Sequence, residues 1–267
     1  MIELNHLTKV YHQGQVKAVD DLNLRVQAGE LFGFLGPNGA GKTTTIKMMA
    51  GLLTPTSGEV IINGHNMARD PLAAKGSLGF VPDNPDIWEK LTGLEYLQFL
   101  ADVYRVPAAA RQARVEELAA TFELQDALGD NIQSYSHGMR QKLVLIGALI
   151  HRPPVLILDE PMVGLDPSSA YLLMDILRRH CDAGNTVFFS THILEVAERL
   201  CDRVGIINKG RLVTLGTMEE IKARHSQGEE TLEQIFLEIT GANLPPERMD
   251  LNTSKALNNL GQHAIPR

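Results

Sequence analysis

The sequence predicts an α/β protein with a parallel β-sheet at its core. The uninterrupted aliphatic run at residues 155–158, VLIL, is typical of a strand covered on both faces. Further strand patterns at residues 186–190 and 204–208 are separated by helical stretches at 168–181 and 193–201. Strands that alternate with helices form a parallel sheet covered by those helices. With 267 residues, 44% of them hydrophobic, the chain can bury such a core without a disulfide or a structural metal.

The first quarter of the chain predicts two kinds of structure in turn. Residues 2–26 mix short alternating segments, such as IELNHLT and AVDDLNLRV, with turn residues, which favours antiparallel strands. The apolar run at residues 31–35 ends in GPNGAG, and from Lys42 onward TTTIKMMAGLL has helical spacing. Residues 58–64, GEVIING, have the pattern of another strand followed by a turn. The order is therefore antiparallel strands, then a strand, a glycine loop and a helix.

The rest of the chain completes the predicted organisation. Helical patterns dominate residues 84–152, which we expect to form a helical subdomain inserted into the core. The core then comprises residues 1–83 and 153–225, including an N-terminal antiparallel β subdomain. Residues 226–267 hold a short helix, TLEQIFLEIT, and a polar, proline-containing tail. We expect this tail to be mobile or to act as an added interaction segment.

Composition excludes several classes of protein. The formal net charge of -7 and the absence of a long Lys/Arg cluster argue against a nucleic-acid partner. The richest apolar run, at residues 143–150, is far shorter than the roughly 20 residues of a membrane-spanning helix. The first residues lack the pattern of a secretory signal, and Cys181 and Cys201 form no CxxC pair. We therefore expect a cytoplasmic protein with two reduced thiols.

The glycine loop at residues 36–43, GPNGAGKT, fits the pattern GxxxxGK[ST] between a predicted strand and a predicted helix. Such a loop turns successive backbone N–H groups toward phosphate oxygens, and the helix that follows adds partial positive charge. Lys42 would reach the β- and γ-phosphates, and the Thr43 hydroxyl would bind Mg²⁺. A glycine-rich turn with a chance Lys-Thr pair is the alternative, which the strand and helix on either side disfavour. The residues expected to contact the nucleotide here are Gly36, Pro37, Asn38, Gly39, Ala40, Gly41, Lys42, Thr43 and Thr44.

Two acids follow the buried strand at residues 155–158. Because an unpaired buried charge is costly, Asp159 and Glu160 at the end of this strand are expected to face a ligand. Asp159 is the expected Mg²⁺ partner, directly or through water, and Glu160 would accept a proton from water attacking the γ-phosphate. Two solvated acids in a turn are the alternative for this motif alone. Together with the glycine loop, the acids predict a P-loop nucleoside-triphosphatase core.

A third motif, YSHGM at residues 135–139, lies upstream of the two acids. Ser136 is a suitable N-cap for a helix with an apolar face, and capping alone is one explanation of it. At this point the chain resembles the nucleotide-binding subunits of ATP-binding cassette (ABC) transporters, whose signature is LSGGQ. Ser136 and Gly138 match that signature, whereas His137 and Met139 depart from it.

Other parts of the family pattern follow in order. Asp166, in PMVGLD, resembles the D-loop, and His192 after a predicted strand resembles the switch histidine. Tyr11 matches the aromatic residue that stacks on adenine, although a half-buried strand tyrosine would explain it equally well. Asp83 stands where the family usually has the glutamine of its Q-loop. A carboxylate at this position can still hold Mg²⁺ or a water molecule, but it is shorter and charged.

The resemblance covers residues 2–241 and is closest to the single-cassette subunits of ABC-2-type exporters. It implies that two cassettes pair head to tail around ATP and Mg²⁺, the second cassette being another copy of this chain or a related one. It also implies hydrolysis that uses Lys42, Glu160 and His192, and a separate integral-membrane permease that meets residues 87–93. The subunit would then lie in the cytoplasm on the inner face of the cell membrane.

Two other functions remain open at the level of sequence. A soluble ABC-type ATPase of DNA repair, chromosome maintenance or translation would share all these motifs. Such proteins usually carry a long coiled coil or two cassettes in one chain, and neither pattern occurs in this sequence. A P-loop small-molecule kinase would need neither the Ser136 motif nor His192.

Overall fold

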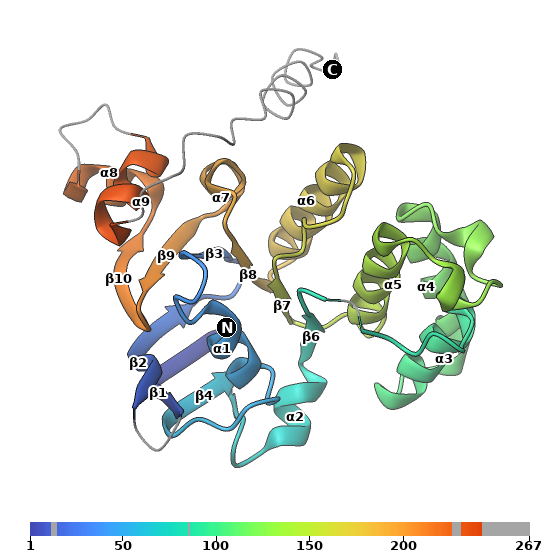
Figure 1. The fold of residues 1–267 in the computed structure, drawn as a ribbon. Helices are drawn as coiled ribbons and strands as arrows, with labels where there is room; N and C mark the ends of the chain where they lie inside the picture. Colours follow the sequence, from blue (N-terminus) through green and yellow to red (C-terminus); the bar gives the residue numbers. More distant parts are fainter. Residues whose placement is uncertain (12–14, 85, 226–230, 242–267) are drawn as a thin grey trace.

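The computed structural model describes residues 1–11, 15–84, 86–225 and 231–241, and the predicted tail after residue 241 lies outside them. The structure is α/β, with two sheets and a group of helices at one side (Figure 1), so the predicted fold class is confirmed. The larger sheet has the strand order β10-β9-β3-β8-β7-β6, and the smaller has the order β2-β1-β4-β5.

The larger sheet is parallel except at one edge. Its parallel strands are β3 (Leu31–Leu35), β6 (Leu78–Val81), β7 (Val155–Asp159), β8 (Thr186–Thr191) and β9 (Arg203–Asn208). The edge strand β10 (Arg211–Gly216) pairs antiparallel to β9. Every residue of β3, β7 and β8 is buried, as the aliphatic run at 155–158 predicts.

The two faces of the larger sheet belong to different hydrophobic cores, because successive side chains of a strand point to opposite faces. Phe32 and Phe34 of β3 pack on Phe188 of β8, with ring centroids 5.5 and 5.2 Å apart, on the face shared with the smaller sheet. The neighbouring residues Val187 and Phe189 lie in the other core, together with the helices at the side.

The smaller sheet is antiparallel, as predicted for the first residues. It contains β1 (Ile2–Tyr11), β2 (Val16–Val26), β4 (Ser57–Ile62) and the short β5 (His65–Asn66). Its buried side chains join the core that contains Phe188. This sheet therefore covers one face of the larger sheet beside β3.

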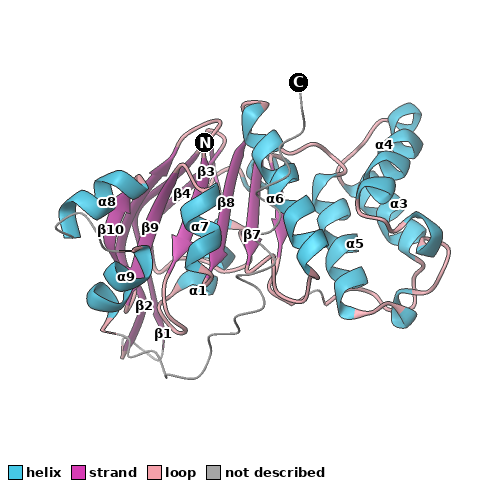
Figure 2. Ribbon diagram, turned by 90° about the horizontal axis from the view of Figure 1, so that it is seen from above, coloured by secondary structure: helices cyan, strands magenta, loops and turns pink. Residues whose placement is uncertain are grey.

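The helices fall into three groups (Figures 1 and 2). Helices α3, α4 and α5 form the group at the side, α1 and α6 follow the central strands β3 and β7, and α7, α8 and α9 lie toward the β9–β10 edge. The short helix α2 stands apart from these groups and packs on β4, β5 and β6. Their bounds are α1 (Lys42–Met49), α2 (Pro71–Gly76), α3 (Gly93–Val103), α4 (Ala108–Thr121), α5 (His137–Leu149), α6 (Pro167–Asp182), α7 (Leu194–Leu200), α8 (Met218–His225) and α9 (Leu232–Thr240). Within the described ranges, no helix is long and apolar enough to cross a membrane.

Candidate nucleotide site

The glycine loop at residues 36–43 connects β3 to α1, and we call it the phosphate loop. Gly41, directly before α1, has φ +111°, a backbone conformation that other residues rarely adopt. A Cβ atom there would lie 2.4 Å from the Ala18 carbonyl oxygen, and one at Gly36 would lie 2.4 Å from the Ile207 carbonyl oxygen. The backbone of the loop therefore packs directly on its neighbours, which explains the glycines at both positions.

Lys42 lies inside the phosphate loop and is only 7% exposed. Its ammonium group donates to the Gly36 carbonyl oxygen at 2.7 Å and lies 3.8 Å from Glu160 Oε1. A buried ammonium needs such partners because removing it from water is costly. The lysine is thus held at the centre of the loop, where an incoming phosphate could replace these partners.

Asp159 ends strand β7 and is 2% exposed. The Ser190 hydroxyl donates to its carboxylate at 2.5 Å. Burial raises the pKa of Asp159, while hydrogen bonds from Ser190 and Thr43 oppose this increase. The structure thus brings together Thr43 and Asp159, the two residues most directly expected to bind Mg²⁺.

This donor set suits Mg²⁺, which prefers oxygen ligands and usually combines one or two carboxylates with substrate phosphates. Thr43 offers a hydroxyl and Asp159 a buried carboxylate. In the described part of the chain, no group of three or more His, Cys, Asp or Glu side chains could hold a metal ion alone. The residues present therefore fit a cation that is bound together with a nucleotide, not one held by protein side chains only.

Glu160 connects Lys42 to His192. His192 Nδ1 lies 2.9 Å from Glu160 Oε2, and Lys42 Nζ lies 3.8 Å from Oε1 of the same carboxylate. Because a carboxylate only accepts hydrogen bonds, Nδ1 carries the proton in this contact. The Glu160 backbone N–H donates to the Ser190 hydroxyl at 3.0 Å, and its φ of +49° is rare for a residue with a side chain.

The parallel pairing of β7 and β8 explains how these side chains meet. Asp159 on β7 pairs with Ser190 on β8, so the residues after each strand, Glu160 and His192, emerge at the same edge of the sheet. Ser190 donates to the Asp159 carboxylate and accepts from the Glu160 backbone N–H, although no motif in the sequence predicts a role for it. The signal that could have identified it is a lone serine near the end of the apolar strand VFFST.

Asp83 lies near Asp159, whereas Tyr11 lies at the end of a strand of the smaller sheet. Asp83 follows β6, the neighbour of β7, and its charge contributes to the raised pKa of Asp159. Its carboxylate accepts a hydrogen bond from the backbone N–H of Asn84 at 2.9 Å. Tyr11 ends β1 and is 37% exposed, and Lys9 Nζ lies 5.4 Å from the centroid of its ring.

The structure does not bring Ser136, Gly138 or Asp166 to the phosphate loop of the same chain. Ser136 is the N-cap of α5, where its hydroxyl accepts from the Met139 N–H, as predicted. Helix α5 packs on α3, α4 and the edge strand β6, and β6 is three strands away from β3. Asp166 is the N-cap of α6, and its hydrogen bonds from Ser168 and Ser169 hold its pKa well below the usual value.

The fold and the site define a P-loop nucleoside-triphosphatase: the glycine loop after the parallel strand β3 encloses Lys42, and two acids stand together at the end of the parallel strand β7. A family model described as ABC transporter matches residues 19–163. The chain belongs to this family and is one of its ATP-binding cassettes, with ATPase activity.

Relatives and solved structures agree with this assignment. The chain is 39% identical over 222 residues to the daunorubicin/doxorubicin resistance ATP-binding protein DrrA of Streptomyces peucetius, a match that covers 83% of this chain and 67% of that protein. A solved ATP-binding subunit of an ABC transporter has a TM-score of 0.85 at 32% identity, covering 90% of this chain and 99% of that one. A dimeric ATP-binding cassette in a post-hydrolysis state, bound to ADP and Pi, has a TM-score of 0.74 at 27% identity, covering 82% and 99%.

Proposed function

We propose that this cassette hydrolyses ATP at the phosphate loop and drives a separate integral-membrane permease in export. The contact chain from Lys42 through Glu160 to His192, beside the Thr43 and Asp159 pair, is the observation that carries the catalytic part. The similarity to a drug-resistance cassette supports export. This proposal includes the division of the chain into a core of residues 1–83 and 153–225, a helical subdomain of 84–152 and a C-terminal part from 226.

The catalytic step follows from the contacts of Lys42 and Glu160. When phosphate oxygens enter the loop, Lys42 would exchange the Gly36 carbonyl and Glu160 for the β- and γ-phosphates. Glu160 is then free to accept a proton from the attacking water, and His192 keeps its carboxylate in place through Nδ1. Thr43 and Asp159, with Asp83 beside them, would hold Mg²⁺, which when bound neutralises phosphate charge.

Two copies of the chain would complete the site. Ser136, Gly138 and Asp166 lie at the starts of α5 and α6, away from the phosphate loop of their own chain. An exposed helix N-terminus with free N–H groups favours an anion such as the γ-phosphate of a second chain. The similarity to a dimeric cassette bound to ADP and Pi supports this arrangement, with a head-to-tail homodimer as the simplest assembly.

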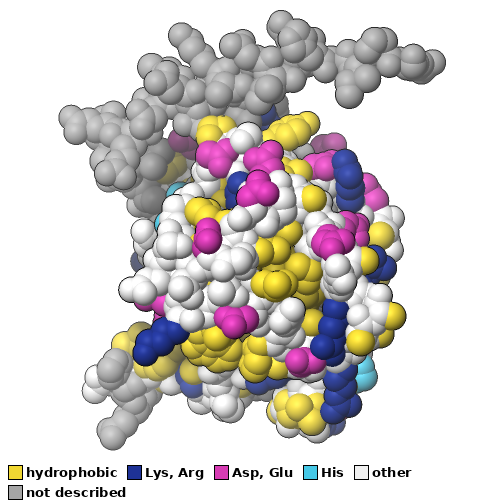
Figure 3. Space-filling view, turned by 90° about the vertical axis from the view of Figure 1, so that its right-hand side faces the viewer, with side chains coloured by type: hydrophobic (Ala, Val, Ile, Leu, Met, Phe, Trp, Pro, Cys, Tyr) yellow, Lys and Arg dark blue, Asp and Glu magenta, His cyan; other side chains and the backbone are white. Residues whose placement is uncertain are grey.

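An exposed hydrophobic group marks the proposed contact with the permease. Trp88 is 56% exposed and packs edge-on against Phe99 of α3, with ring centroids 4.9 Å apart, and Leu94 and Val103 of the same helix are also exposed. Figure 3, which views the helical side of the molecule, shows hydrophobic side chains gathered on this face. Exposed apolar patches of this kind are typical of interaction sites. The subunit would therefore be held at the inner face of the cell membrane.

Purification of the tagged chain from detergent-solubilised membranes tests this function. We expect a protein with several membrane spans to co-purify with the wild type, and at least tenfold less of it to co-purify with the Trp88→Ala, Phe99→Ala double variant. Val213→Ala, at an exposed position of β10 on the other side of the fold, is the matched control and retains the partner. Recovery in the soluble fraction on DNA or ribosomes would instead support a soluble ABC-type ATPase.

A further inference from the structure

The phosphate loop is supported from outside by two backbone segments. Strand β2 contributes Ala18, whose carbonyl oxygen lies against Gly41. The turn between β9 and β10 contributes Gly210, whose N–H donates to the Ala40 carbonyl oxygen at 2.8 Å. These two segments belong to different sheets, β2 to the smaller and β9 and β10 to the larger. The shape of the loop therefore depends on how firmly the two sheets are joined here.

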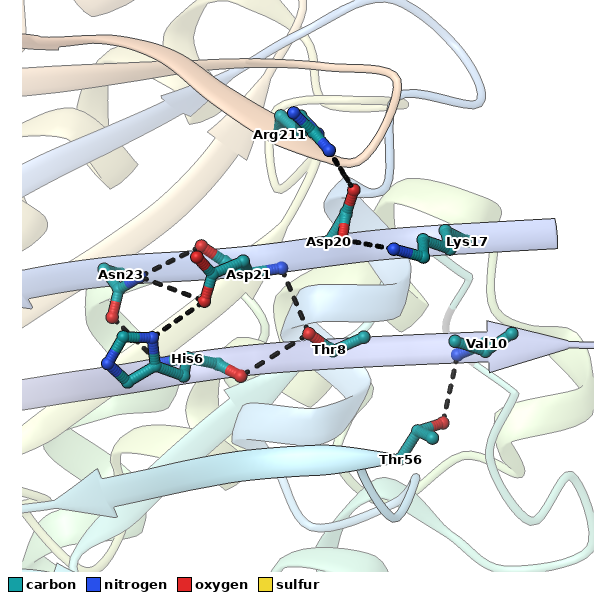
Figure 4. Close-up of polar contacts among 9 residues, drawn as sticks. All are labelled: His6, Thr8, Val10, Lys17, Asp20, Asp21, Asn23, Thr56 and Arg211. Carbon is teal, nitrogen blue, oxygen red and sulfur yellow. Dashed lines mark hydrogen bonds and ion pairs between the residues drawn. The ribbon is translucent and has the colours of Figure 1, made fainter. Parts of the chain in front are cut away.

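Asp20 joins them, as Figure 4 shows for its side-chain contacts. The Asp20 N–H donates to the Gly210 carbonyl oxygen at 2.9 Å. Its carboxylate Oδ2 accepts from Arg211 Nε at 2.9 Å and Nη2 at 2.7 Å, while Oδ1 accepts from Lys17 Nζ at 3.0 Å. The Asp20 side chain is only 14% exposed, whereas its two cationic partners are largely exposed. Asp20 is thus the centre of a three-residue contact that holds the β9–β10 turn on β2.

The same contact also affects Tyr11, the residue expected to stack on adenine. Tyr11 ends β1 and pairs with Val16 at the start of β2, four residues before Asp20. A shift of β2 relative to the β9–β10 turn would therefore move Tyr11 relative to the phosphate loop. By contrast, Glu160 and His192 follow β7 and β8 and touch none of these residues in the contacts of the described chain.

We propose that Asp20 is a positioning residue for nucleotide binding: it fastens the β9–β10 turn to β2, and the turn in turn fixes the phosphate loop through the Gly210 to Ala40 hydrogen bond. This inference rests on the proposed role of the loop in binding ATP. A loop that is already ordered loses less freedom when the ligand arrives, so it binds more tightly. Loosening the loop weakens binding, whereas the protonation chemistry at Glu160 proceeds as before once ATP is bound.

Substitutions that break the Asp20 contact test the proposal. In Asp20→Ala and Arg211→Ala, we expect the Kd for ATP and the KM to rise about twofold to fivefold, the effect of an ion pair held in a good geometry, with kcat changed by much less. The double variant should be no worse than either single variant, because both remove the same contact. Asp20→Asn keeps an acceptor oxygen for Arg211 and should fall between Asp20→Ala and the wild type.

Glu59→Ala is the matched control. It removes the 2.7 Å ion pair between Glu59 of β4 and Arg69, a comparable surface contact in the smaller sheet that does not touch the phosphate loop. We expect its Kd to equal that of the wild type. Thermal unfolding of every variant is measured in parallel, because a purely structural role for Asp20 would lower the melting temperature and the active fraction without raising the Kd.

The outcomes separate this inference from the function on which it rests. Equal Kd values for Asp20→Ala, Glu59→Ala and the wild type would overturn the positioning role, provided that Lys42→Ala weakens binding in the same titration. If the wild type and Lys42→Ala bound ATP equally poorly, the proposed nucleotide site itself would be wrong. A raised Kd confined to the Asp20 and Arg211 variants would support the positioning role.

Discussion

His137 stands where the resembling signature has its first glycine, and the structure shows what its ring contacts. A Cβ atom added to Gly164 would lie 2.2 Å from His137 Cδ2, so the ring lies directly against the backbone of Gly164. Gly164 has φ +81° and belongs to the segment that leads to Asp166 and α6. The segments at the starts of α5 and α6, which we expect to face a second chain, are therefore packed on each other. The His137 ring therefore occupies the space that a side chain at position 164 would need.

At the scale of single residues, Tyr11 gives a direct test of base recognition. Stacking of a base on an aromatic ring is worth about 1–3 kcal/mol. We therefore expect Tyr11→Ala to weaken ATP binding by this amount and to leave turnover at saturating ATP nearly unchanged, because the phosphates and metal supply most of the remaining affinity. Tyr11→Phe, which keeps the ring, should bind as the wild type does. Fluorescence titration and steady-state kinetics measure both quantities, and a loss of saturated turnover in Tyr11→Ala would contradict this role.

At the scale of elements, His151 lies at the junction between the helical group and the larger sheet. Its ring stacks on Tyr104, just after α3, with centroids 3.7 Å apart, and its Nε2 lies 3.2 Å from the Leu78 carbonyl oxygen of β6. Since a carbonyl oxygen only accepts, Nε2 carries the proton, and the buried Nδ1 has no hydrogen-bond partner. Burial lowers the pKa of His151 to about 4, so the folded protein holds this imidazole neutral.

This lowered pKa makes stability depend on pH in a defined direction. An unfolded histidine has a pKa near 6.5, so below about pH 6.5 the unfolded chain binds a proton that the folded protein does not bind until about pH 4. Above about pH 6.5, His151 does not lower the free energy of unfolding. As the pH falls from 6.5 toward 4, His151 lowers the free energy of unfolding by at most about 1.4 kcal/mol for each pH unit.

His151→Phe tests this effect, because phenylalanine keeps the stacked ring but cannot titrate. Urea unfolding at pH 7.5 and pH 5 should show a smaller loss of unfolding free energy in the variant than in the wild type, whatever their difference at pH 7.5. Every other residue is the same in the two proteins, so the comparison isolates His151. Identical pH dependence in the two proteins would show that His151 is not held neutral by the fold.

Strands with a continuous apolar run or a long alternating pattern were predictable from the sequence, whereas β6 and β10, at the two edges of the larger sheet, were not. β3 and β7 are buried on both faces, so each consists almost entirely of apolar residues. β6 has four residues, LGFV, too few for a period, and becomes a strand because it pairs with β7. β10 lies at the sheet edge and alternates between exposed and buried positions, so its apolar content is diluted.

The residues of the site also divide into those that the sequence predicts and those that only the fold brings together. Lys42, Thr43 and the two acids lie in short motifs whose spacing along the chain reports their geometry. The contact between Glu160 and His192 depends on the register of β7 against β8, which the sequence does not display. Asp20 belongs to no motif, because its partner Arg211 lies 191 positions away in another sheet. Long-range contacts of this kind become visible only in the folded chain.

At the scale of the whole molecule, the parts of the proposed ATP site lie at two separate places in each chain. The phosphate loop and the acids lie on the central strands of the larger sheet, while the start of α5 lies beyond its β6 edge (Figures 1 and 2). Adjacent strands are about 4.8 Å apart, so the three steps from β3 to β6 alone span roughly 14 Å. A hydrogen bond does not reach across this distance, so in the proposed function the start of α5 would meet ATP bound to a second copy of the chain.

In the function that we propose, Glu160 acts on ATP enclosed between two copies of this chain. The most direct measurement is the turnover and the ATP-dependent size of the Glu160→Gln variant, with Lys42→Ala as a control that should stay monomeric. We predict that Glu160→Gln hydrolyses ATP about 10²- to 10⁴-fold more slowly and elutes as a dimer from a sizing column only when ATP is present. Full turnover together with a monomer in ATP would contradict the claim.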